Sequence, residues 1–238
     1  MKAMIFAAGL GSRLGELTKD TPKCLMPLGK VTILEHVIGR LKDAGVTSAT
    51  INVHHCADQV ISFVESRGDF GISINFSREE NLLDTGGGLK KVASFFKDER
   101  AFIVHNADVF SSIDLTELVK SHLSRGAIGT LAVLKRESTR GLYLSSDLRL
   151  VGWTEEKSSS YPPANSALFG FCGVSVASGE LFQHMQNDEA FSLIDPYLRA
   201  ARSTGRVWGV PVPDSTWIDI GKPEHLAVAT AKLADTEK

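Results

Sequence analysis

The chain has 238 residues, of which 43% are hydrophobic and 23% charged, so it can bury a core and is neither disordered nor fibrous. The formal net charge of −2 excludes the strongly basic footprint of a general nucleic-acid binder. The 3 cysteines lie far apart, which argues against a disulfide framework and favours a reducing compartment.

A membrane segment and an export signal are also disfavoured. No stretch approaches the roughly 20 apolar residues needed to cross a bilayer. Residues 1–10 have no small-residue cleavage site after a proper apolar region, and a buried first strand explains them better. We therefore expect a soluble cytoplasmic protein with no nucleic-acid and no membrane partner.

The first part of the chain alternates short apolar runs with amphipathic stretches. The apolar runs predict strands over residues 2–8, 49–54, 72–76, 101–105 and 128–134. Between them, helices are predicted over residues 33–44, 57–66, 89–96 and 115–123. This alternation indicates βαβ units and a mostly parallel sheet with helices on both faces.

The pattern changes after Lys135. A hairpin is predicted over residues 142–144 and 148–151, and further strands over residues 168–176, 207–212 and 217–220. Helices are predicted over residues 179–185, 191–202 and 223–233. We expect a single domain over residues 1–238, with one half at residues 1–135 and a smaller mixed half at residues 136–238.

Chemically unusual segments follow four of the predicted strands. They are residues 9–13, 54–56, 84–88 and 106–108. Ligands of open parallel sheets bind beyond the carboxyl ends of the strands, so these segments should share one edge. By contrast, Glu79 and Glu80 are expected on a solvated face.

The first of these segments is rich in glycine. Gly9 and Gly11 allow a positive φ and expose N–H groups to phosphate oxygens, while Arg13 offers a planar cation for bidentate phosphate contact. An ordinary strand-to-helix turn is the alternative. A dinucleotide-binding loop fits less well, because Gly15 comes one residue late and no acidic residue ends the second strand.

Three charged residues are further candidates. Lys23 lies between two prolines, which should hold it in a rigid extended segment where it could meet a second phosphate. Asp108 follows an apolar strand and suits Mg²⁺, and Asp219 lies between two isoleucines, where a charge is costly unless paired or bound to metal. The alternatives are a solvated lysine, a turn at Asp108 and a structural salt bridge at Asp219.

These motifs, in this order, resemble the sugar-1-phosphate nucleotidylyltransferase family. They are Gly9-Leu10-Gly11-Ser12-Arg13, Thr21-Pro22-Lys23, Asp84-Thr85-Gly86-Gly87-Gly88, Asn106-Ala107-Asp108 and Trp217-Ile218-Asp219-Ile220-Gly221. The resemblance covers nearly the whole chain and is strongest to the short bacterial N-acetylmuramate 1-phosphate uridylyltransferases. It implies an α/β, glycosyltransferase-A-like (Rossmann-like) fold with a mixed, mostly parallel sheet and helices on both faces.

The resemblance also implies roles for the matching residues. Arg13, Lys23 and Asp108 would be catalytic, and Asp108 and Asp219 would hold Mg²⁺. The nucleotide would be bound in the first half, by Ala8, Gly9, Gly11, Arg13, Asp84, Thr85, Gly86 and Gly87. Three departures from the family pattern leave every charged catalytic group in place: Cys24 for a proline, Ala107 for a glycine, and Lys222 for a small hydroxyl residue.

Sugar-binding candidates lie in the second half. The glycine- and phenylalanine-rich segment around Gly173 suggests a sugar-lining strand, although the phenylalanines could equally fill the core. Asn165 and Arg140 could reach a sugar substituent. Lys157 matches the family's Glu-Lys-Pro motif, except that Ser158 stands in place of the proline, so a solvated loop pair is the alternative.

The implied reaction joins a nucleoside triphosphate and a sugar 1-phosphate into a nucleoside diphosphate sugar and pyrophosphate. UTP and N-acetylmuramate 1-phosphate are the favoured substrates, which would place the enzyme in the recycling of peptidoglycan for cell-wall precursors. We expect a monomer or a homodimer. A GTP-dependent mannose- or heptose-1-phosphate guanylyltransferase is the alternative. A non-catalytic nucleotide-sugar sensor is disfavoured because Lys23, Asp108 and Asp219 are all present.

Overall fold

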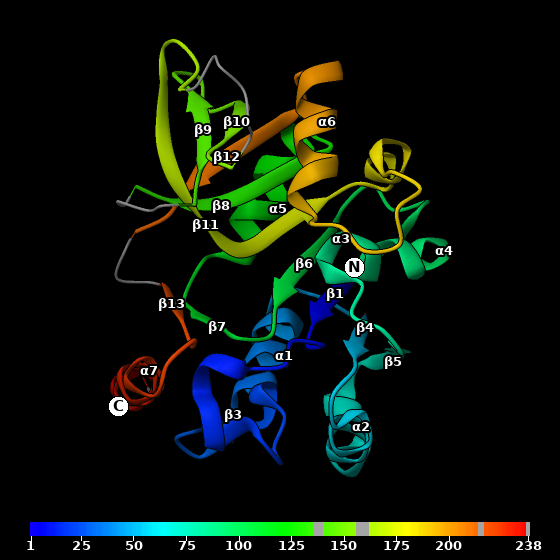
Figure 1. The fold of residues 1–238 in the computed structure, drawn as a ribbon, viewed down its shortest axis with the longest axis vertical. Helices are drawn as coiled ribbons and strands as arrows, with labels where there is room; N and C mark the ends of the chain where they lie inside the picture. The colour runs from blue at the N-terminus through cyan, green and yellow to red at the C-terminus, as the bar shows by residue number, and fades with distance from the viewer. Residues whose placement is uncertain (136–139, 156–161, 214–216, 237–238) are drawn as a thin grey trace. The chain divides into compact units, whose positions relative to one another are not determined.

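The computed structural model describes residues 1–135, 140–155, 162–213 and 217–236. The chain divides into two compact units. Unit 1 comprises Met1–Leu82, His105–Ser112 and Trp217–Lys238, and unit 2 comprises Leu83–Val104 and Ile113–Thr216. Figure 1 shows the elements of both units in chain order by colour. Unit 1 thus draws on both ends of the chain and does not follow the predicted halves.

Three parallel strands lie in unit 1: β1 (Lys2–Phe6), β4 (Ser48–Val53) and β5 (Ser73–Arg78). In the register of this sheet, Phe6 of β1 lies beside Asn52 of β4. All three strands were predicted from the apolar runs, to within two residues at each end. The carboxyl ends of β1 and β4 therefore lie side by side, and the glycine-rich segment follows β1 directly.

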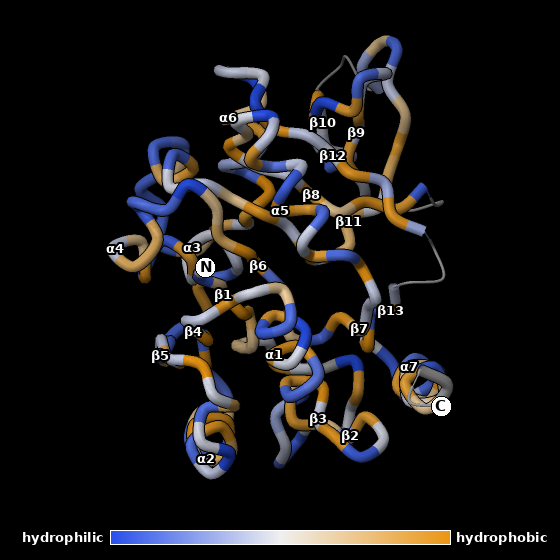
Figure 2. The backbone as a smooth tube through the Cα atoms, turned by 180° about the vertical axis from the view of Figure 1, so that it is seen from behind, coloured by the Kyte–Doolittle hydropathy of each residue, from blue (hydrophilic) through white to orange (hydrophobic). Residues whose placement is uncertain are grey.

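Two predicted helices of unit 1 are confirmed: α1 (Ile33–Asp43) and α2 (Ala57–Ser66). At the start of α1, Thr32 and Glu35 form a capping box, in which each side chain bonds to the other residue's backbone N–H. The apolar face of α1 is buried at Leu34, Val37 and Leu41, as its spacing predicts. Figure 2 shows hydrophobic and hydrophilic residues alternating round the turns of α2, as expected of an amphipathic helix.

The rest of unit 1 consists of short elements and the C-terminal helix. They are η1 (Ser12–Thr18), η2 (Lys23–Leu25), β2 (Pro27–Leu28), β3 (Val31–Thr32), η3 (Gly68–Gly71), β7 (Val109–Ser111), β13 (Trp217–Asp219) and α7 (Pro223–Thr236). Strands β2, β3, β7 and β13 and helix α7 pack round a core made of Met26, Leu28, Ile33, Phe110, Ile220 and Ala229. The extended segment expected at Lys23 was wrong: prolines flank the residue, but a single 3-10 turn fits between them.

The strands of unit 2 are of mixed direction. They are β8 (Gly129–Leu134), β9 (Leu142–Ser145), β10 (Leu150–Trp153), β11 (Ser166–Ala177) and β12 (Val207–Pro211). Strands β9 and β10 form the predicted hairpin, β11 pairs antiparallel with β8 and β9, and β12 pairs parallel with β8. A further strand, β6 (Phe102–Asn106), begins in unit 2 and ends in unit 1.

The helices of unit 2 are α3 (Asp84–Lys91), α4 (Ala93–Phe96), α5 (Leu115–Ser124), η4 (Gly179–His184) and α6 (Ile194–Thr204). The single helix expected over residues 89–96 was wrong, because the backbone breaks at Val92. The glycine turn expected before it is instead the first part of α3. No described helix has the length and the apolar surface that a membrane crossing needs.

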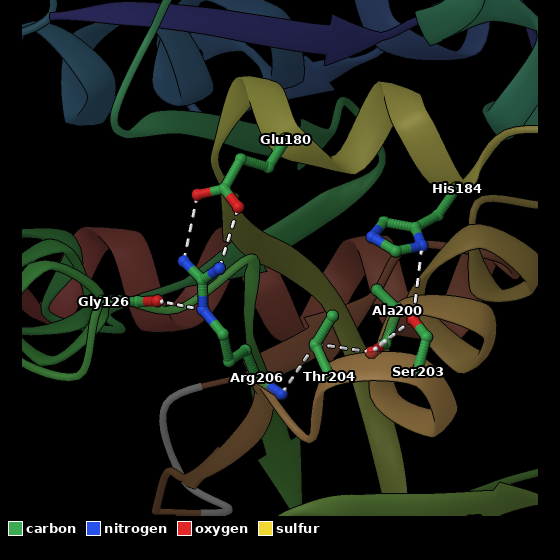
Figure 3. Close-up of polar contacts among 7 residues, drawn as sticks. All are labelled: Gly126, Glu180, His184, Ala200, Ser203, Thr204 and Arg206. Carbon is green, nitrogen blue, oxygen red and sulfur yellow. Dashed lines mark hydrogen bonds and ion pairs between the residues drawn. The ribbon is translucent and has the colours of Figure 1, made fainter.

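Arg206 ties together the segments that meet at the end of α6 (Figure 3). Its guanidinium donates to both carboxylate oxygens of Glu180, at 2.8 and 2.9 Å, and its Nε donates to the Gly126 carbonyl at 2.8 Å. The backbone N–H of Arg206 donates to Thr204 Oγ1 at 3.1 Å. Gly205 ends the helix with a φ of 66°, in the left-handed region that favours glycine.

Buried His122 should make unit 2 less stable in mild acid. The residue is 1% exposed, and its Nδ1 lies 3.1 Å from Thr130 Oγ1. Burial, helped by the positive charge of Arg206 and opposed by a backbone hydrogen bond with Arg100, lowers the pKa of His122 to about 4. Because this pKa lies below that of an unfolded histidine, the unfolded chain binds the proton first as the pH falls from about 6.5.

Between pH 7 and pH 5, protonation of His122 in the unfolded chain should therefore lower the free energy of unfolding by about 2 kcal/mol. Urea unfolding of the parent and of His122→Gln at both pH values measures this share. The variant should lose about 2 kcal/mol less than the parent between the two values. An equal loss in the two proteins would contradict the assignment.

Candidate functional site

The glycine-rich segment after β1 is held in a left-handed turn. Gly11 precedes η1 with a φ of 66° and a ψ of 17°. A Cβ atom at Gly11 would lie 3.0 Å from Thr18 Cγ2 and 3.2 Å from Lys23 Cβ, so both conformation and space favour glycine. Thr18 Oγ1 donates to the Gly11 carbonyl at 3.0 Å. Of the predicted nucleotide-binding residues here, Ala8 is buried and Gly9 is exposed.

Lys23 and Asp108, predicted separately, form a close ion pair. Lys23 Nζ lies 2.6 Å from Asp108 Oδ2, and the side chains are 10% and 31% exposed. A cation this buried needs a counter-charge, which Asp108 supplies. The neighbouring Cys24 is buried, and burial raises the pKa of its thiol to about 12, so it is a neutral packing group and not a nucleophile at neutral pH.

Arg13 and Asp219 form the second, more open pair. Arg13 Nη1 lies 3.8 Å from Asp219 Oδ2, and the side chains are 66% and 34% exposed. Exposed pairs of this kind contribute little to stability, about 0–1 kcal/mol, so Arg13 is free to exchange its partner for another anion. A Cβ atom at Gly221 would lie 3.1 Å from Arg13 Nη1, which shows how closely the backbone approaches the guanidinium.

The two carboxylates lie at the paired ends of two short strands: Asp108 directly precedes β7, and Asp219 is the last residue of β13. β13 pairs antiparallel with β7, placing Asp219 opposite Val109, and the Ile220 N–H donates to the Asp108 carbonyl at 2.9 Å. Mg²⁺ is usually held by one or two carboxylates together with substrate phosphates, and this pair offers those donors. Within the described ranges no cluster of three or more histidine, cysteine or acidic side chains suits a metal. The donor set therefore fits an ion shared with a phosphate ligand.

Two neutral histidines support this part of unit 1. His36 stacks on Phe110 with ring centroids 4.9 Å apart, and Arg40 donates to the Ser111 carbonyl beside it. Burial, helped by the positive charge of Arg40, lowers the pKa of His36 and of His105 to about 4. Neither ring is an imidazolium at neutral pH, so the two histidines pack and position rather than act as general acids.

The sequence missed two polar residues beside the first strand. Asn52 is 3% exposed, and its Nδ2 donates to Glu79 Oε1 at 2.8 Å. Glu79 is 5% exposed, so the expected solvated face was wrong for this residue and right for Glu80. A signal was present, because an asparagine within a buried strand requires a hydrogen-bond partner.

The predicted nucleotide-binding residues of unit 2 lie at the start of α3. Asp84 is exposed, and the Thr85 hydroxyl accepts a hydrogen bond from the Leu193 N–H at 3.0 Å. Gly86 and Gly87 are buried, and their N–H groups donate to the Phe191 carbonyl at 2.8 and 3.3 Å. The two glycines thus have a packing role, in addition to the nucleotide contact predicted from the sequence.

Gly87→Ala should destabilise the chain by about 3 kcal/mol, because a Cβ atom there would lie 2.2 Å from the Glu189 carbonyl oxygen. Urea unfolding measures this loss. Gly39→Ala is the matched control: it lies inside α1 with nothing within 4 Å of its Cβ position, and it should gain up to about 1 kcal/mol. Equal stability of the two variants would contradict the packing role.

The predicted sugar-binding residues that the structure describes lie on or beside strands of unit 2. Arg140 is exposed and forms an ion pair with Glu155, with Nε 2.5 Å from Oε1, and the hydrogen bond lowers the pKa of Glu155. Asn165 is exposed with a φ of 55°, just before β11. Gly173, with a φ of 71°, lies where the register of β11 against β8 shifts. Lys157 lies outside the described residues.

Comparison with known proteins gives these positions a context. A protein-family model described as nucleotidyl transferase matches residues 2–143. A UTP–glucose-1-phosphate uridylyltransferase from Synechocystis is 29% identical over 93% of the chain, which spans 60% of that protein's length. A D-glycero-alpha-D-manno-heptose 1-phosphate guanylyltransferase from Aneurinibacillus thermoaerophilus is 27% identical over 98% of both chains.

Two further relatives match over nearly their full length. An N-acetylmuramate alpha-1-phosphate uridylyltransferase from Caulobacter vibrioides is 29% identical over 98% of this chain and 97% of its own. The crystal structure of a candidate glucose-1-phosphate thymidylyltransferase from Bacillus anthracis superposes with a TM-score of 0.82 at 21% identity, covering 98% of this chain and 94% of that one. This likeness confirms the predicted α/β, glycosyltransferase-A-like fold.

Proposed function

Because this chain belongs to the nucleotidyl transferase family, we propose that it transfers a nucleoside monophosphate from a nucleoside triphosphate to a sugar 1-phosphate. The observation that carries the proposal is the charge arrangement of unit 1. Two cations, Lys23 and Arg13, are each paired with a carboxylate, Asp108 just before β7 and Asp219 at the end of the neighbouring strand β13. All three curated relatives described above are named for transfer to a sugar 1-phosphate, which supports the same substrate class.

The obstacle in this reaction is charge repulsion. A sugar 1-phosphate has a second pKa of about 6 and is largely dianionic at neutral pH, so it needs no general base to act as the nucleophile. One of its phosphate oxygens attacks the α-phosphorus, the bond from that phosphorus to the bridging oxygen breaks, and pyrophosphate leaves. Catalysis then depends on bringing two polyanions together in line.

Four side chains of unit 1 meet this need. Asp108 and Asp219 would hold Mg²⁺, which would supply positive charge to the phosphates. Lys23 binds phosphate near the reacting centre, and Arg13 binds the triphosphate through its planar guanidinium. The backbone N–H groups around Gly9 and Gly11 add further donors. The neutral His36 and His105 take no part in proton transfer.

We assign the remaining contacts to unit 2. Asp84 and Thr85 contact the nucleotide, while the sugar is contacted by Arg140, Asn165, Gly173 and Lys157. The exposure of Asp84, Arg140 and Asn165 supports these roles, because a ligand can reach them. Gly86 and Gly87 contribute to nucleotide binding indirectly, since their close packing holds the start of α3, which carries Asp84 and Thr85.

UTP and N-acetylmuramate 1-phosphate are the substrates we favour. The Caulobacter relative matches this chain from end to end and supports that pair. The Aneurinibacillus relative matches equally fully and supports GTP with a heptose 1-phosphate as the second candidate. In the first case the product would be a precursor for cell-wall synthesis.

A substrate matrix tests both candidates. Each of UTP, GTP, ATP, CTP and dTTP is combined with the 1-phosphates of N-acetylmuramate, glucose, mannose and a heptose, and released pyrophosphate is measured with Mg²⁺ or with a chelator. We expect release with UTP and N-acetylmuramate 1-phosphate that stops on chelation. Release with GTP and a heptose 1-phosphate would select the second candidate. No release with any pair would contradict the proposed class of reaction.

A further inference from the structure

One peptide group connects the glycine-rich segment to the segment that carries Asp108. It is the bond between Phe6 and Ala7, at the end of β1. Its carbonyl accepts a hydrogen bond from the Ala107 N–H at 2.9 Å, and its N–H donates to Asn52 Oδ1 at 2.8 Å. Asp108 follows Ala107 directly, so this single planar group is held from both sides.

Asn52 can hold the peptide only in one of its two amide orientations. Rotating the amide by half a turn would bring Nδ2 against the Ala7 N–H, where two donors would face each other. Glu79 selects the correct orientation, since its carboxylate accepts hydrogen bonds and Asn52 Nδ2 donates to Oε1 at 2.8 Å. Both side chains are at least nine-tenths buried, so water offers no alternative partner.

Glu79 is itself fixed by its backbone. Its N–H donates to the Val53 carbonyl at 2.8 Å, and its carbonyl lies 2.8 Å from His54 Nδ1. The carboxylate is therefore presented from the end of β5 to the end of β4. A chain of hydrogen bonds thus runs from Glu79 through Asn52 to the Phe6–Ala7 peptide and on to Ala107.

We propose that Asn52 and Glu79 are positioning residues for nucleotidyl transfer: Glu79 orients the Asn52 amide, and Asn52 holds the Phe6–Ala7 peptide so that the glycine-rich segment and Asp108 keep a fixed register. This inference rests on the proposed function. Neither side chain need touch substrate. A displacement of about 1 Å between a phosphate-binding loop and a catalytic carboxylate can cost about 100-fold in rate, so a small loss of order here has a large effect.

The test exchanges the two chemical groups. Asn52→Asp places two carboxylates against each other and should lower kcat/KM for the nucleoside triphosphate about 100-fold. Glu79→Gln removes the group that selects the amide orientation and should have a smaller effect of the same kind. In the double variant, a carboxylate at position 52 accepts from both the Ala7 N–H and the amide at position 79, so kcat/KM should recover to within about 5-fold of the parent.

Amide hydrogen exchange at Ala7 gives a readout that does not depend on activity. Exchange should be slow in the parent, faster in Asn52→Asp and slow again in the double variant. The matched control is Asn75→Asp with Glu80→Gln, the same two changes at exposed positions on and just after β5, which should alter neither readout. A merely structural role for Asn52 would lower the melting temperature, leave KM unchanged and speed exchange at Ala7 only as much as at the other buried amides of β1.

The outcomes separate this inference from the proposed function. If the parent releases pyrophosphate and the double variant recovers neither kcat/KM nor Ala7 protection, the positioning role is overturned. It is also overturned if Asn52→Asp keeps kcat/KM within about twofold. If the parent releases no pyrophosphate with any substrate pair, the proposed function fails, and Asn52 and Glu79 then have no catalytic role. Ala7 exchange still decides in that case whether the two side chains hold the Phe6–Ala7 peptide.

Discussion

Asp108→Ala should lower kcat for pyrophosphate release by about 1,000-fold or more while the chain still folds. The variant removes one of two carboxylates available to Mg²⁺ and leaves Lys23, whose side chain is 10% exposed, without its counter-ion. The backbone contact between Ile220 and the Asp108 carbonyl does not involve the side chain, so the pairing of β13 with β7 should persist. Steady-state kinetics and urea unfolding measure the two effects separately.

The stability cost of Asp108→Ala should be about 1–3 kcal/mol, the usual penalty for a buried polar group left without a partner. Asp43→Ala is the control, because Asp43 is exposed at the end of α1 and should alter neither kcat nor stability. Turnover of Asp108→Ala close to that of the parent would remove Asp108 from the catalytic site.

Lys23→Met should lower kcat by about 100-fold to 1,000-fold, because methionine keeps much of the side-chain volume and removes the charge proposed to bind the phosphates. The effect should differ in kind from that of Asp108→Ala. With Lys23 gone, Asp108 loses the cation that now lies 2.6 Å away, so Mg²⁺ binding should be kept or strengthened while turnover falls. Metal affinity and kcat, measured on the same preparations, separate the two roles.

Lys19→Met is the matched control for Lys23→Met. Lys19 lies on the same stretch of chain, but its side chain is 68% exposed and pairs only loosely with Glu16, at 3.9 Å. Its replacement should leave kcat within about twofold of the parent. Equal losses in the two variants would mean that general surface charge, and not Lys23, attracts the substrates.

Each candidate catalytic group is marked locally in the sequence, which is why it could be proposed without a structure. Asp108 ends an apolar strand, Asp219 interrupts one, and prolines flank Lys23. The rule that ligands bind at the carboxyl ends of parallel strands predicted that these motifs share one edge of the sheet. In the structure the charged groups pair with one another, Lys23 with Asp108 and Arg13 with Asp219, and at Asp219 this is the salt bridge that was the alternative to a metal site.

Features that depend on distant partners could not be predicted in this way. The packing of Gly87 against Glu189 joins residues about a hundred positions apart, and no local pattern encodes it. The polarity of Asn52 was visible, but its two partners lie on other segments. The 3-10 turn at Lys23 was missed because flanking prolines restrict the residues before them and leave the turn between them open.

Asp108 and Asp219 are proposed to hold one divalent cation jointly with the nucleotide. Electron paramagnetic resonance with Mn²⁺ in place of Mg²⁺ tests it directly, by counting bound ions in the presence of a nucleoside triphosphate. The parent with bound nucleotide should hold one Mn²⁺ per chain, more tightly than the nucleotide holds it alone, and Asp108→Asn and Asp219→Asn should each bring that affinity back towards the value for the nucleotide alone. Unchanged Mn²⁺ affinity in both variants would contradict a cation shared by these two carboxylates.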